Sequence, residues 1–195
     1  MTKRVFIWVA HPKAGSLCAA LADAYQSGVE ANGAETIRMD LSEMDFDPHF
    51  EGYGADTPAL EPALIDWQGA IAWADHVMVI HPYWWGAMPT RAKAVLDRAL
   101  TPGFGFKYHE KGAAWDKLLK GKTADGIITS DTPPLIDTLL YQKPARRVLK
   151  NQVFGFCGMK VRRVVQIGSV KLASKKKIRS WFGRMRRMGE RAALS

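Results

Sequence analysis

The sequence is poor in cysteine and has no long apolar run. Its two cysteines, Cys18 and Cys157, lie far apart and lack the spacing of metal ligands. A disulfide scaffold and a metal site are therefore not expected, and a reduced, cytoplasmic chain is. The apolar stretch at residues 5–10 is too short for a signal peptide. No stretch approaches the ~20 apolar residues of a membrane helix, so we expect a soluble protein.

Several nucleotide-binding and catalytic motifs are incomplete. Gly121-Lys122-Thr123 matches the end of a P-loop, but Asp116 stands where the first glycine belongs. Gly103 and Gly105 lack the third glycine of a dinucleotide fingerprint, and His109-Glu110 lacks the second histidine of a zinc protease. The chain has no nucleophile elbow either. These absences argue against a P-loop enzyme, a fingerprint-type dinucleotide binder and a zinc protease.

Acidic residues are scarce only in the C-terminal fifth of the chain. Residues 160–195 hold twelve Lys and Arg against one acid, Glu190, which gives this segment a net charge of +11. Because the whole chain carries +9, residues 1–159 carry −2. Three interpretations stay open: a solvated helix face, weak attraction to an anionic membrane surface, and nucleic-acid binding. No reading motif for nucleic acid accompanies the charge, so specific nucleic-acid binding is not expected.

Strand-like and helix-like stretches alternate along the chain, which has the length of one domain and is 47% apolar. We expect a single domain over residues 1–195, with a basic C-terminal helix at about 174–193. The expected strands are 4–9, 36–41, 77–80, 123–129 and 161–167. We expect a first helix that begins at about Ser16. Four further helices are expected at 62–73, 89–100, 146–156 and 174–193. The stretches 42–57 and 101–121 are expected to be irregular, and 132–135 a proline-bearing loop.

This alternation predicts an α/β fold of the flavodoxin-like kind, a three-layer sandwich around a five-stranded parallel sheet in the order 2-1-3-4-5. That order reverses between the first and third strands. A ligand should therefore lie outside the carboxyl ends of these two strands, at residues 10–16 and 81–88.

The first of these loops has the composition of a phosphate site. It runs from His11 to Ser16 and joins a central strand to the start of a helix. Free backbone N–H groups, the helix dipole, the Ser16 hydroxyl and the Lys13 charge would all favour a phosphate there. The alternative is a tight turn capped by Ser16.

The second loop holds three successive aromatic residues, Tyr83, Trp84 and Trp85, between Pro82 and Gly86. Such a run packs poorly in a core strand, because alternate residues face opposite ways. In a rigid loop it offers a flat apolar surface for a planar heterocycle. The alternative is aromatic filling beneath the loop.

Further motifs follow in collinear order between residues 5 and 168. They are Ala10-His11-Pro12 with Ser16, Pro82-Tyr83-Trp84-Trp85-Gly86 with Pro89, Lys93, Asp97 and Arg98, then Gly103-Phe104-Gly105-Phe106-Lys107-Tyr108, and Phe156-Cys157-Gly158. In these motifs the chain resembles the flavodoxin-like NAD(P)H:quinone oxidoreductases, including the drug-modulator and potassium-efflux ancillary relatives.

The resemblance implies a bound flavin, NAD(P)H as co-substrate, and a homodimer whose two subunits share each active site. It assigns the flavin phosphates to His11, Ser16, Leu17 and Cys18. It assigns the isoalloxazine to Pro82, Tyr83, Trp84 and Trp85, with Trp85 the more important tryptophan. It assigns the pyrimidine end of the flavin to Thr129, Ser130, Asp131 and Thr132.

The chain departs from the family pattern after the fourth strand. It has no histidine after His109, whereas relatives use a tyrosine and a histidine there to stabilise reduced flavin. Thr129 and Ser130, with their backbone N–H groups, are the candidate catalytic donors, and Tyr141 is a candidate for the missing tyrosine. Cys18 stands where relatives often have asparagine.

The implied activity is two-electron, ping-pong hydride transfer from NAD(P)H through flavin to a quinone. FMN is favoured over FAD, because no residue set is dedicated to an adenine. Three alternatives stay open: an azo or nitro reductase with the same flavin chemistry, a regulatory ancillary subunit of a membrane transporter, and a one-electron carrier of the flavodoxin type. The homodimer is expected to bury the aromatic stretch 104–115.

Overall fold

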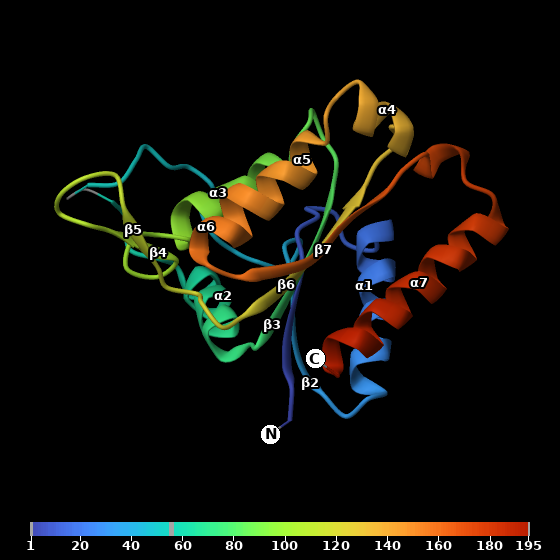
Figure 1. Ribbon diagram of the computed structural model, residues 1–195, viewed down its shortest axis with the longest axis horizontal. Coiled ribbons are helices and arrows are strands. Elements are labelled where there is room, and N and C mark those ends of the chain that lie inside the picture. The colour runs from blue at the N-terminus through green and yellow to red at the C-terminus, as the bar shows by residue number, and fades with distance from the viewer. Residues whose placement is uncertain (1, 55–56, 195) are drawn as a thin grey trace.

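The computed structural model describes residues 2–54 and 57–194. Its centre is a parallel sheet with the strand order β2-β1-β3-β6-β7, and helices cover both faces of that sheet (Figure 1). The strands are β1 (Arg4–Val9), β2 (Glu35–Asp40), β3 (His76–Pro82), β6 (Thr123–Thr129) and β7 (Lys160–Ile167).

The helices form the two outer layers of the sandwich. On one face lie α1 (Leu17–Glu30) and α7 (Lys175–Ala193), which pack against each other. The other face carries α2 (Pro62–Trp73), α3 (Thr90–Ala99), α5 (Pro144–Arg147), the π-helical segment η1 (Val148–Phe154) and α6 (Gly155–Cys157). The short elements α4 (Pro134–Leu139) and η2 (Val170–Leu172) follow β6 and β7.

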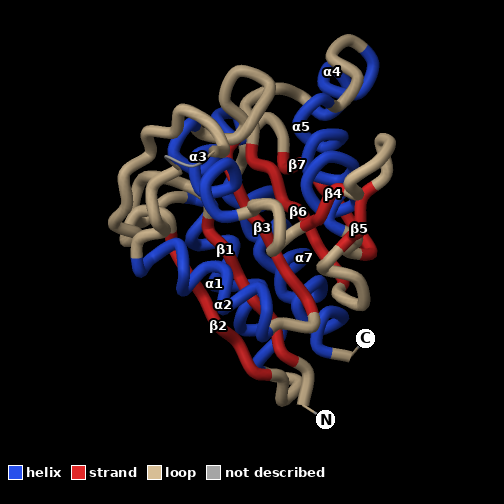
Figure 2. Tube along the Cα trace, turned by 90° about the vertical axis from the view of Figure 1, so that its left-hand side faces the viewer, coloured by secondary structure: helices blue, strands red, loops and turns tan. Residues whose placement is uncertain are grey.

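The predicted fold class and strand order are confirmed. The fourth and fifth strands of the sheet are numbered β6 and β7 because an antiparallel hairpin precedes them. This hairpin, β4 (Phe106–Tyr108) with β5 (Trp115–Lys117), forms within the stretch expected to be irregular. Figure 1 shows the hairpin to one side of the main sheet, and Figure 2 is viewed from that side.

Three expected boundaries were wrong. The third strand extends to Pro82, so His81 and Pro82 belong to the sheet rather than to the loop. The stretch expected to be a proline-bearing loop contains the start of α4, with Pro134 in the first turn where proline is tolerated. The helix expected over 146–156 begins at Pro144 and is largely π-helical.

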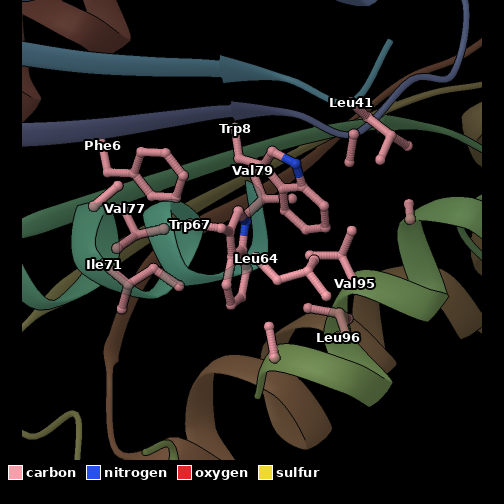
Figure 3. Packing of buried hydrophobic residues seen from close by; sticks show 14 of the residues in the cluster. Phe6, Trp8, Leu41, Leu64, Trp67, Ile71, Val77, Val79, Val95 and Leu96 are labelled. Atoms are coloured by element: carbon pink, nitrogen blue, oxygen red, sulfur yellow. The ribbon is translucent and has the colours of Figure 1, made fainter. Parts of the chain in front are cut away.

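The core beneath α2 and α3 depends on large side chains from β1 and β3. Trp8 and Trp67 meet edge to face with ring centroids 5.3 Å apart, and aliphatic side chains fill the remaining space around them (Figure 3). Alternate residues of β1 and β3 point to the two faces of the sheet, so both faces are apolar, as a central parallel strand requires.

The helices α1 and α7 pack closely because each has a glycine that faces the backbone of the other helix. A Cβ added at Gly28 would lie 2.1 Å from the Arg186 carbonyl oxygen, and one at Gly189 would lie 2.0 Å from the Tyr25 carbonyl oxygen. The stripe expected on the C-terminal helix is confirmed: Trp181, Met185, Met188 and Ala192 are buried and Ile178 is partly buried. Among the described residues, none of the helices has both the length and the apolar character to span a bilayer.

Candidate functional site

Three loops converge at the carboxyl ends of β1, β3 and β6. The hydrogen-bond ladder continues beyond each strand and joins the loops to their neighbours. Ala10 N–H donates to the Ile80 carbonyl at 2.8 Å, Tyr83 N–H to the Thr129 carbonyl at 2.7 Å, and Ser130 N–H to the Ile167 carbonyl at 2.9 Å. Hydrogen bonds to a neighbouring strand or loop therefore fix the start of each loop.

The loops enclose a cavity of about 360 Å³, within the usual size range of small-molecule sites. Its wall is formed by His11, Leu17, Cys18, Pro82, Tyr83, Trp84, Thr129, Ser130, Asp131, Thr132 and Val170. Ten of these residues are among those assigned to the flavin from the sequence. Ser16 and Trp85, also assigned to it, do not line this cavity.

Ser16 acts as the helix N-cap. Its hydroxyl oxygen accepts a hydrogen bond from Ala19 N–H at 3.3 Å, and Gly15 precedes it with a positive φ of 64°. The turn also holds His11, whose Nδ1 accepts from Lys13 N–H at 3.0 Å. Partial burial and the Lys13 charge lower the pKa of His11. The imidazole is therefore neutral at pH 7, with Nε2 carrying the proton.

The N-terminus of α1 opens into the cavity. Leu17 and Cys18 line the wall, and their N–H groups precede the first helical hydrogen bond, from Ala20 N–H to the Ser16 carbonyl at 3.1 Å. No acidic side chain occupies the first turn of this helix. The positive end of the helix dipole is thus left for an anion, as at phosphate sites.

The aromatic loop is a two-residue reverse turn. Trp84 N–H donates to the Ala87 carbonyl at 2.9 Å and Ala87 N–H returns a bond to the Trp84 carbonyl at 3.0 Å. The two central residues, Trp85 and Gly86, have φ of 49° and 81°. A turn of this kind favours Asn-Gly, and a bulky residue at positive φ is an outlier that signals strain.

This turn separates the two tryptophans. Trp84 lines the cavity and meets the His11 ring edge to face, with centroids 5.6 Å apart. Trp85 projects from the turn with its side chain fully exposed. Neither ring fills the core beneath the loop, so the alternative of simple aromatic filling is wrong.

Cys18 and Thr129 form the buried floor between the first and third loops. The Cys18 sulfur lies 3.3 Å from the Thr129 hydroxyl, and both side chains are buried. Burial raises the pKa of Cys18 to about 12, although the Thr129 hydroxyl opposes this. The thiol therefore stays protonated and serves as a weak hydrogen-bonding group, not as a nucleophile.

The loop after β6 is tied to the segment after β7. The Ser130 hydroxyl accepts from Thr132 N–H at 2.9 Å, and the Asp131 carboxylate accepts from Lys171 N–H at 2.8 Å. The Ser130 carbonyl also accepts from Val170 N–H at 3.1 Å. These bonds fix the loop and bring Val170 into the wall. Val170 follows the fifth strand of the sheet, whose end carries no sequence pattern that indicates a site.

Tyr83 has a support that the sequence did not reveal. Burial and the Asp137 carboxyl raise its pKa, so its phenol is protonated at neutral pH. Asp137 is buried and paired with Arg146 at 2.6 Å. Tyr141 does not line the cavity but a neighbouring depression, with Pro144 and others, although it is close enough to Tyr83 to contribute to that raised pKa.

The cavity fits a flavin on the chemistry of its groups. Helix N–H groups face one part of the wall, an indole ring another, and hydroxyl groups with adjacent backbone a third. A phosphate, a planar ring system and the polar edge of a pyrimidine need these three kinds of surface.

The chain is similar to known proteins over most of its length. A family model described as having a flavodoxin-like fold matches residues 3–186. An uncharacterized NAD(P)H oxidoreductase from Haemophilus influenzae is 30% identical over 155 residues, which are 77% of this chain and 76% of that protein.

Solved structures share the fold. An NAD(P)H:quinone oxidoreductase from Methanothermobacter marburgensis superposes with a TM-score of 0.80 at 21% identity, over 97% of this chain and 98% of the other. An FMN-dependent NADH-azoreductase from Bacillus anthracis, determined in complex with FMN, has a TM-score of 0.72 at 15% identity, over 98% and 99% of the two chains.

Proposed function

Because the chain belongs to a family of flavodoxin-like NAD(P)H oxidoreductases, we propose that it transfers hydride from NAD(P)H to a quinone with the help of a bound flavin. One observation carries this proposal. The cavity at the carboxyl ends of β1, β3 and β6 brings together ten residues, from three distant segments, that the family resemblance assigns to flavin. The strand order alone predicts a ligand there, and the residue types select which ligand.

The first loop and α1 hold the phosphate end. Leu17 and Cys18 present N–H groups at the positive end of the helix dipole, and His11 offers a neutral ring N–H beside them. Ser16 orders these donors as the cap of the helix, and its hydroxyl hydrogen is left to reach an anion. We propose FMN as the flavin, since the wall contains no group dedicated to an adenine.

The aromatic loop and the loop after β6 orient the ring system. Trp84 would hold its flat face, and Pro82 and Tyr83 line the same wall. When bound, the flavin supplies reversible acceptance of a hydride. The Thr129 and Ser130 hydroxyls would supply donors to the polar edge, whose negative charge rises during reduction. The N–H groups of Ser130 and Thr132, expected from the sequence to share this role, are bonded within the chain to the Ile167 carbonyl and the Ser130 hydroxyl.

A protonated phenol borders the reacting region. Tyr83 keeps its proton at neutral pH because burial and the Asp137 carboxyl raise its pKa, and its hydroxyl hydrogen is directed to that carboxyl. Tyr141 lies nearby and is the candidate for the family's tyrosine. The partner of that tyrosine in relatives is a histidine, and this chain has none beyond His109. Thr129 and Ser130 therefore carry the donor role.

A kinetic experiment tests the reaction. Anaerobic mixing with NADH or NADPH should bleach the flavin absorbance, and a later addition of menadione should restore it. Parallel double-reciprocal lines in steady state would support the ping-pong order. Flavin that stays oxidised with both nicotinamides would refute the proposed function.

Azo reduction is the second candidate. The structural likeness to an FMN-dependent NADH-azoreductase favours it, although the fold alone is shared at that identity. Both acceptor classes are flat and take two electrons, so the same cavity suits either. Comparing kcat/KM for menadione and methyl red on one enzyme preparation ranks them directly.

We also propose a homodimer, but not through the aromatic stretch 104–115. Two of those aromatic residues pack within the chain: Trp115 stacks on Phe156 at 4.7 Å, and Phe106 meets Phe156 edge to face at 4.9 Å. Tyr108 is the exposed one. The apolar surface instead lies around α4, where Leu135, Leu139 and Leu140 are about 70% exposed. Such a patch favours burial against a second subunit.

This surface borders the cavity. A Cβ added at Gly86 would lie 4.0 Å from Pro144 Cγ, which places the strained turn and the exposed Trp85 near the start of α5. A partner docked on α4 would therefore cover the mouth of the site with Trp85 at the interface. Light scattering should give a dimer for the natural chain and a monomer of low activity for Leu139→Lys. A natural chain that is monomeric and fully active would refute the shared site.

A further inference from the structure

The exposed side of α7 forms a cationic face that no ligand of the flavin cavity requires. Its buried side packs on α1 through Trp181, Met185 and Met188. The opposite side carries exposed cations throughout its length: Lys175, Lys176, Lys177, Arg179, Arg184, Arg186, Arg187 and Arg191. The helix is therefore amphipathic, but its apolar side is already covered.

Neighbouring acids do not neutralise this face. Within residues 2–54 and 57–194, one ion pair involves a cation of α7. It joins Arg186 to Glu190 at 3.4 Å, and both side chains are exposed to solvent in part. A solvated helix face in an ordinary domain mixes both signs of charge, whereas this one adds eight positive charges to a chain whose first 159 residues carry −2. Such a surface attracts a polyanion.

One apolar side chain stands among the cations. Leu172, at the end of η2, is 85% exposed and lies between Lys171 and the lysines that begin α7. An exposed leucine flanked by lysines contributes nothing to a phosphate groove in nucleic acid. It does suit a lipid surface, where the cations meet headgroups and the leucine enters the acyl region. The exposed part of α7 also lacks an aromatic ring for base stacking, since Trp181 is buried and Phe182 partly so.

We propose that the face formed by Lys171, Leu172 and the exposed cations of α7 binds the surface of an anionic lipid bilayer. Because the apolar stripe is buried on α1, the helix lies on the headgroups and does not insert. Attraction is then mainly electrostatic, with Leu172 as a single anchor.

This contact would place the flavin cavity near the bilayer. Val170 lines the cavity, and Lys171 N–H binds the Asp131 carboxylate in its wall. The membrane-facing segment therefore begins directly at the rim of the site. A lipophilic acceptor dissolved in the bilayer would have a short path to the cavity. This consequence rests on the proposed function, whereas lipid binding itself does not.

Sedimentation with vesicles tests the proposal on the full chain and needs no flavin. The protein should bind vesicles of phosphatidylcholine with phosphatidylglycerol but not vesicles of phosphatidylcholine alone. Raising the salt from about 0.1 M to about 1 M should release it, because the screening length falls from about 10 Å to about 3 Å. No binding to the anionic vesicles would overturn the proposal, and the proposed oxidoreductase would be unaffected.

Two sets of variants localise the contact. Reversing Lys175, Lys176 and Lys177 to Glu should weaken binding by at least about a hundredfold, since each lysine near an anionic surface contributes close to one factor of five. Acids in the first turn also favour the helix dipole, so α7 should stay folded. The matched control reverses Lys107, Lys111 and Lys120, which are exposed around the β4–β5 hairpin. An equal loss in the control would reduce the effect to net charge and overturn the assignment.

Leu172→Ser separates lipid from nucleic acid. It should weaken vesicle binding several-fold and leave binding to a poly(U) probe unchanged, with Leu194→Ser as the control for another exposed leucine. If the natural chain bound poly(U) more tightly than anionic vesicles, and Leu172→Ser changed neither, the surface would be a nucleic-acid site and the proposal would be wrong.

Discussion

The two ends of the central strands carry similar side chains in opposite circumstances. At the amino end of β3 and β6, Thr123, His76, Tyr25 and Asp125 form a chain of contacts. At the carboxyl end of the same strands, Thr129, Ser130 and Cys18 face the cavity. Hydroxyl groups are present at both ends, but only the carboxyl end leaves them facing open space.

The amino-end cluster, the closed end of these strands, is buried and linked by side-chain hydrogen bonds, with one oxygen of the Asp125 carboxylate left over. Tyr25 donates to the Asp125 carboxylate at 3.2 Å and lies 2.9 Å from His76 Nε2, and His76 Nδ1 lies 2.7 Å from the Thr123 hydroxyl. One direction of donation, from Thr123 through His76 and Tyr25 to Asp125, satisfies each of these contacts. Burial lowers the pKa of His76 to about 3 and raises the pKa values of Tyr25 and Asp125.

Polar residues within a sheet are therefore not in themselves evidence for a site. The buried network joins α1 to β3 and β6 through hydrogen bonds between their side chains. The carboxyl end gains function from geometry, because parallel strands bring the loops of distant segments to one edge. Substitutions at the amino end should therefore change stability, and substitutions at the carboxyl end, the open end, should change flavin binding.

Acid should produce the largest effect. His76 and His81 are buried, and burial lowers their pKa values to about 3 and about 4. The unfolded chain takes up protons below its ordinary histidine pKa near 6.5, while the folded chain does not until near 4. Stability is thus lost as the pH falls from 6.5 toward 4, by up to ~1.4 kcal/mol per pH unit for each imidazole. The raised pKa of Asp125 opposes this loss.

Urea unfolding at pH 7, 6 and 5 measures that slope. His76→Gln and His81→Gln should each remove about half of it, one at the closed end and one beneath the cavity. Because slopes are compared, a lower absolute stability of either variant does not affect the result. A free energy of unfolding that stays constant from pH 7 to pH 5 would contradict the burial of neutral imidazoles.

Tyr25→Phe disrupts the hydrogen-bonded cluster at the amino end of β3 and β6. It removes the hydroxyl that joins His76 to Asp125 and leaves a buried carboxylate short of a donor, which should cost about 3 kcal/mol of unfolding free energy. Flavin affinity of the folded protein should not change. The control is Tyr53→Phe, whose exposed phenol donates to the Asp97 carbonyl at 2.7 Å and should cost less than about 1 kcal/mol. A loss of flavin affinity in Tyr25→Phe would show that the two ends are coupled.

Trp84→Ala removes an aromatic ring from the cavity wall at the carboxyl end. Loss of a ring stacked on a planar ligand should weaken flavin binding by about tenfold to a hundredfold, with a smaller change in stability of the apo-protein. Trp115→Ala is the opposite case, since its ring stacks on Phe156 and its N–H binds the Phe156 carbonyl at 2.9 Å. That change should lower stability by about 2 kcal/mol and leave flavin affinity alone.

Trp85→Ala completes this series. The family resemblance makes Trp85 the more important tryptophan, whereas the cavity wall favours Trp84. If Trp85 serves only the subunit interface, its replacement should alter light scattering and leave flavin affinity within about twofold in the dimer. An affinity loss equal to that of Trp84→Ala would place the Trp85 ring beside the flavin.

The smallest effects come from the two ends of β6 itself, Thr123 and Thr129. Thr123→Val should cost about 1 kcal/mol of stability, because His76 loses a hydrogen-bond partner, with no change in flavin affinity. Thr129→Val should weaken flavin binding by about fivefold, with little change in stability, since its contact with the Cys18 sulfur is weak. Exchanged outcomes would contradict the assignment of the two ends.

Local sequence patterns predicted the sheet and most of the wall. Alternating strand and helix patterns fix the strand order, and the order brings His11 and Trp84 together without any local signal between them. The end of β3 was missed because His81 and Pro82 interrupt an apolar run, although both pair with β6. The hairpin β4–β5 was missed because its strands are short and mostly exposed.

Contacts between distant segments explain the remaining differences. Val170 enters the wall through hydrogen bonds to the loop after β6, and Asp137 supports Tyr83 from α4 while paired with Arg146. Nothing in the spacing of these residues reveals such contacts. Trp85 shows the same limit, because the turn that points it away from the cavity is set by φ at two residues and not by composition.

The central claim is that the cavity binds a flavin, and identifying the released cofactor tests it most directly. The purified protein should be yellow, and denaturation should release a molecule with the mass and absorbance of FMN. Apo-protein should then bind FMN with micromolar or tighter affinity, and FAD less tightly. Failure of both FMN and FAD to bind at micromolar concentrations would contradict the account.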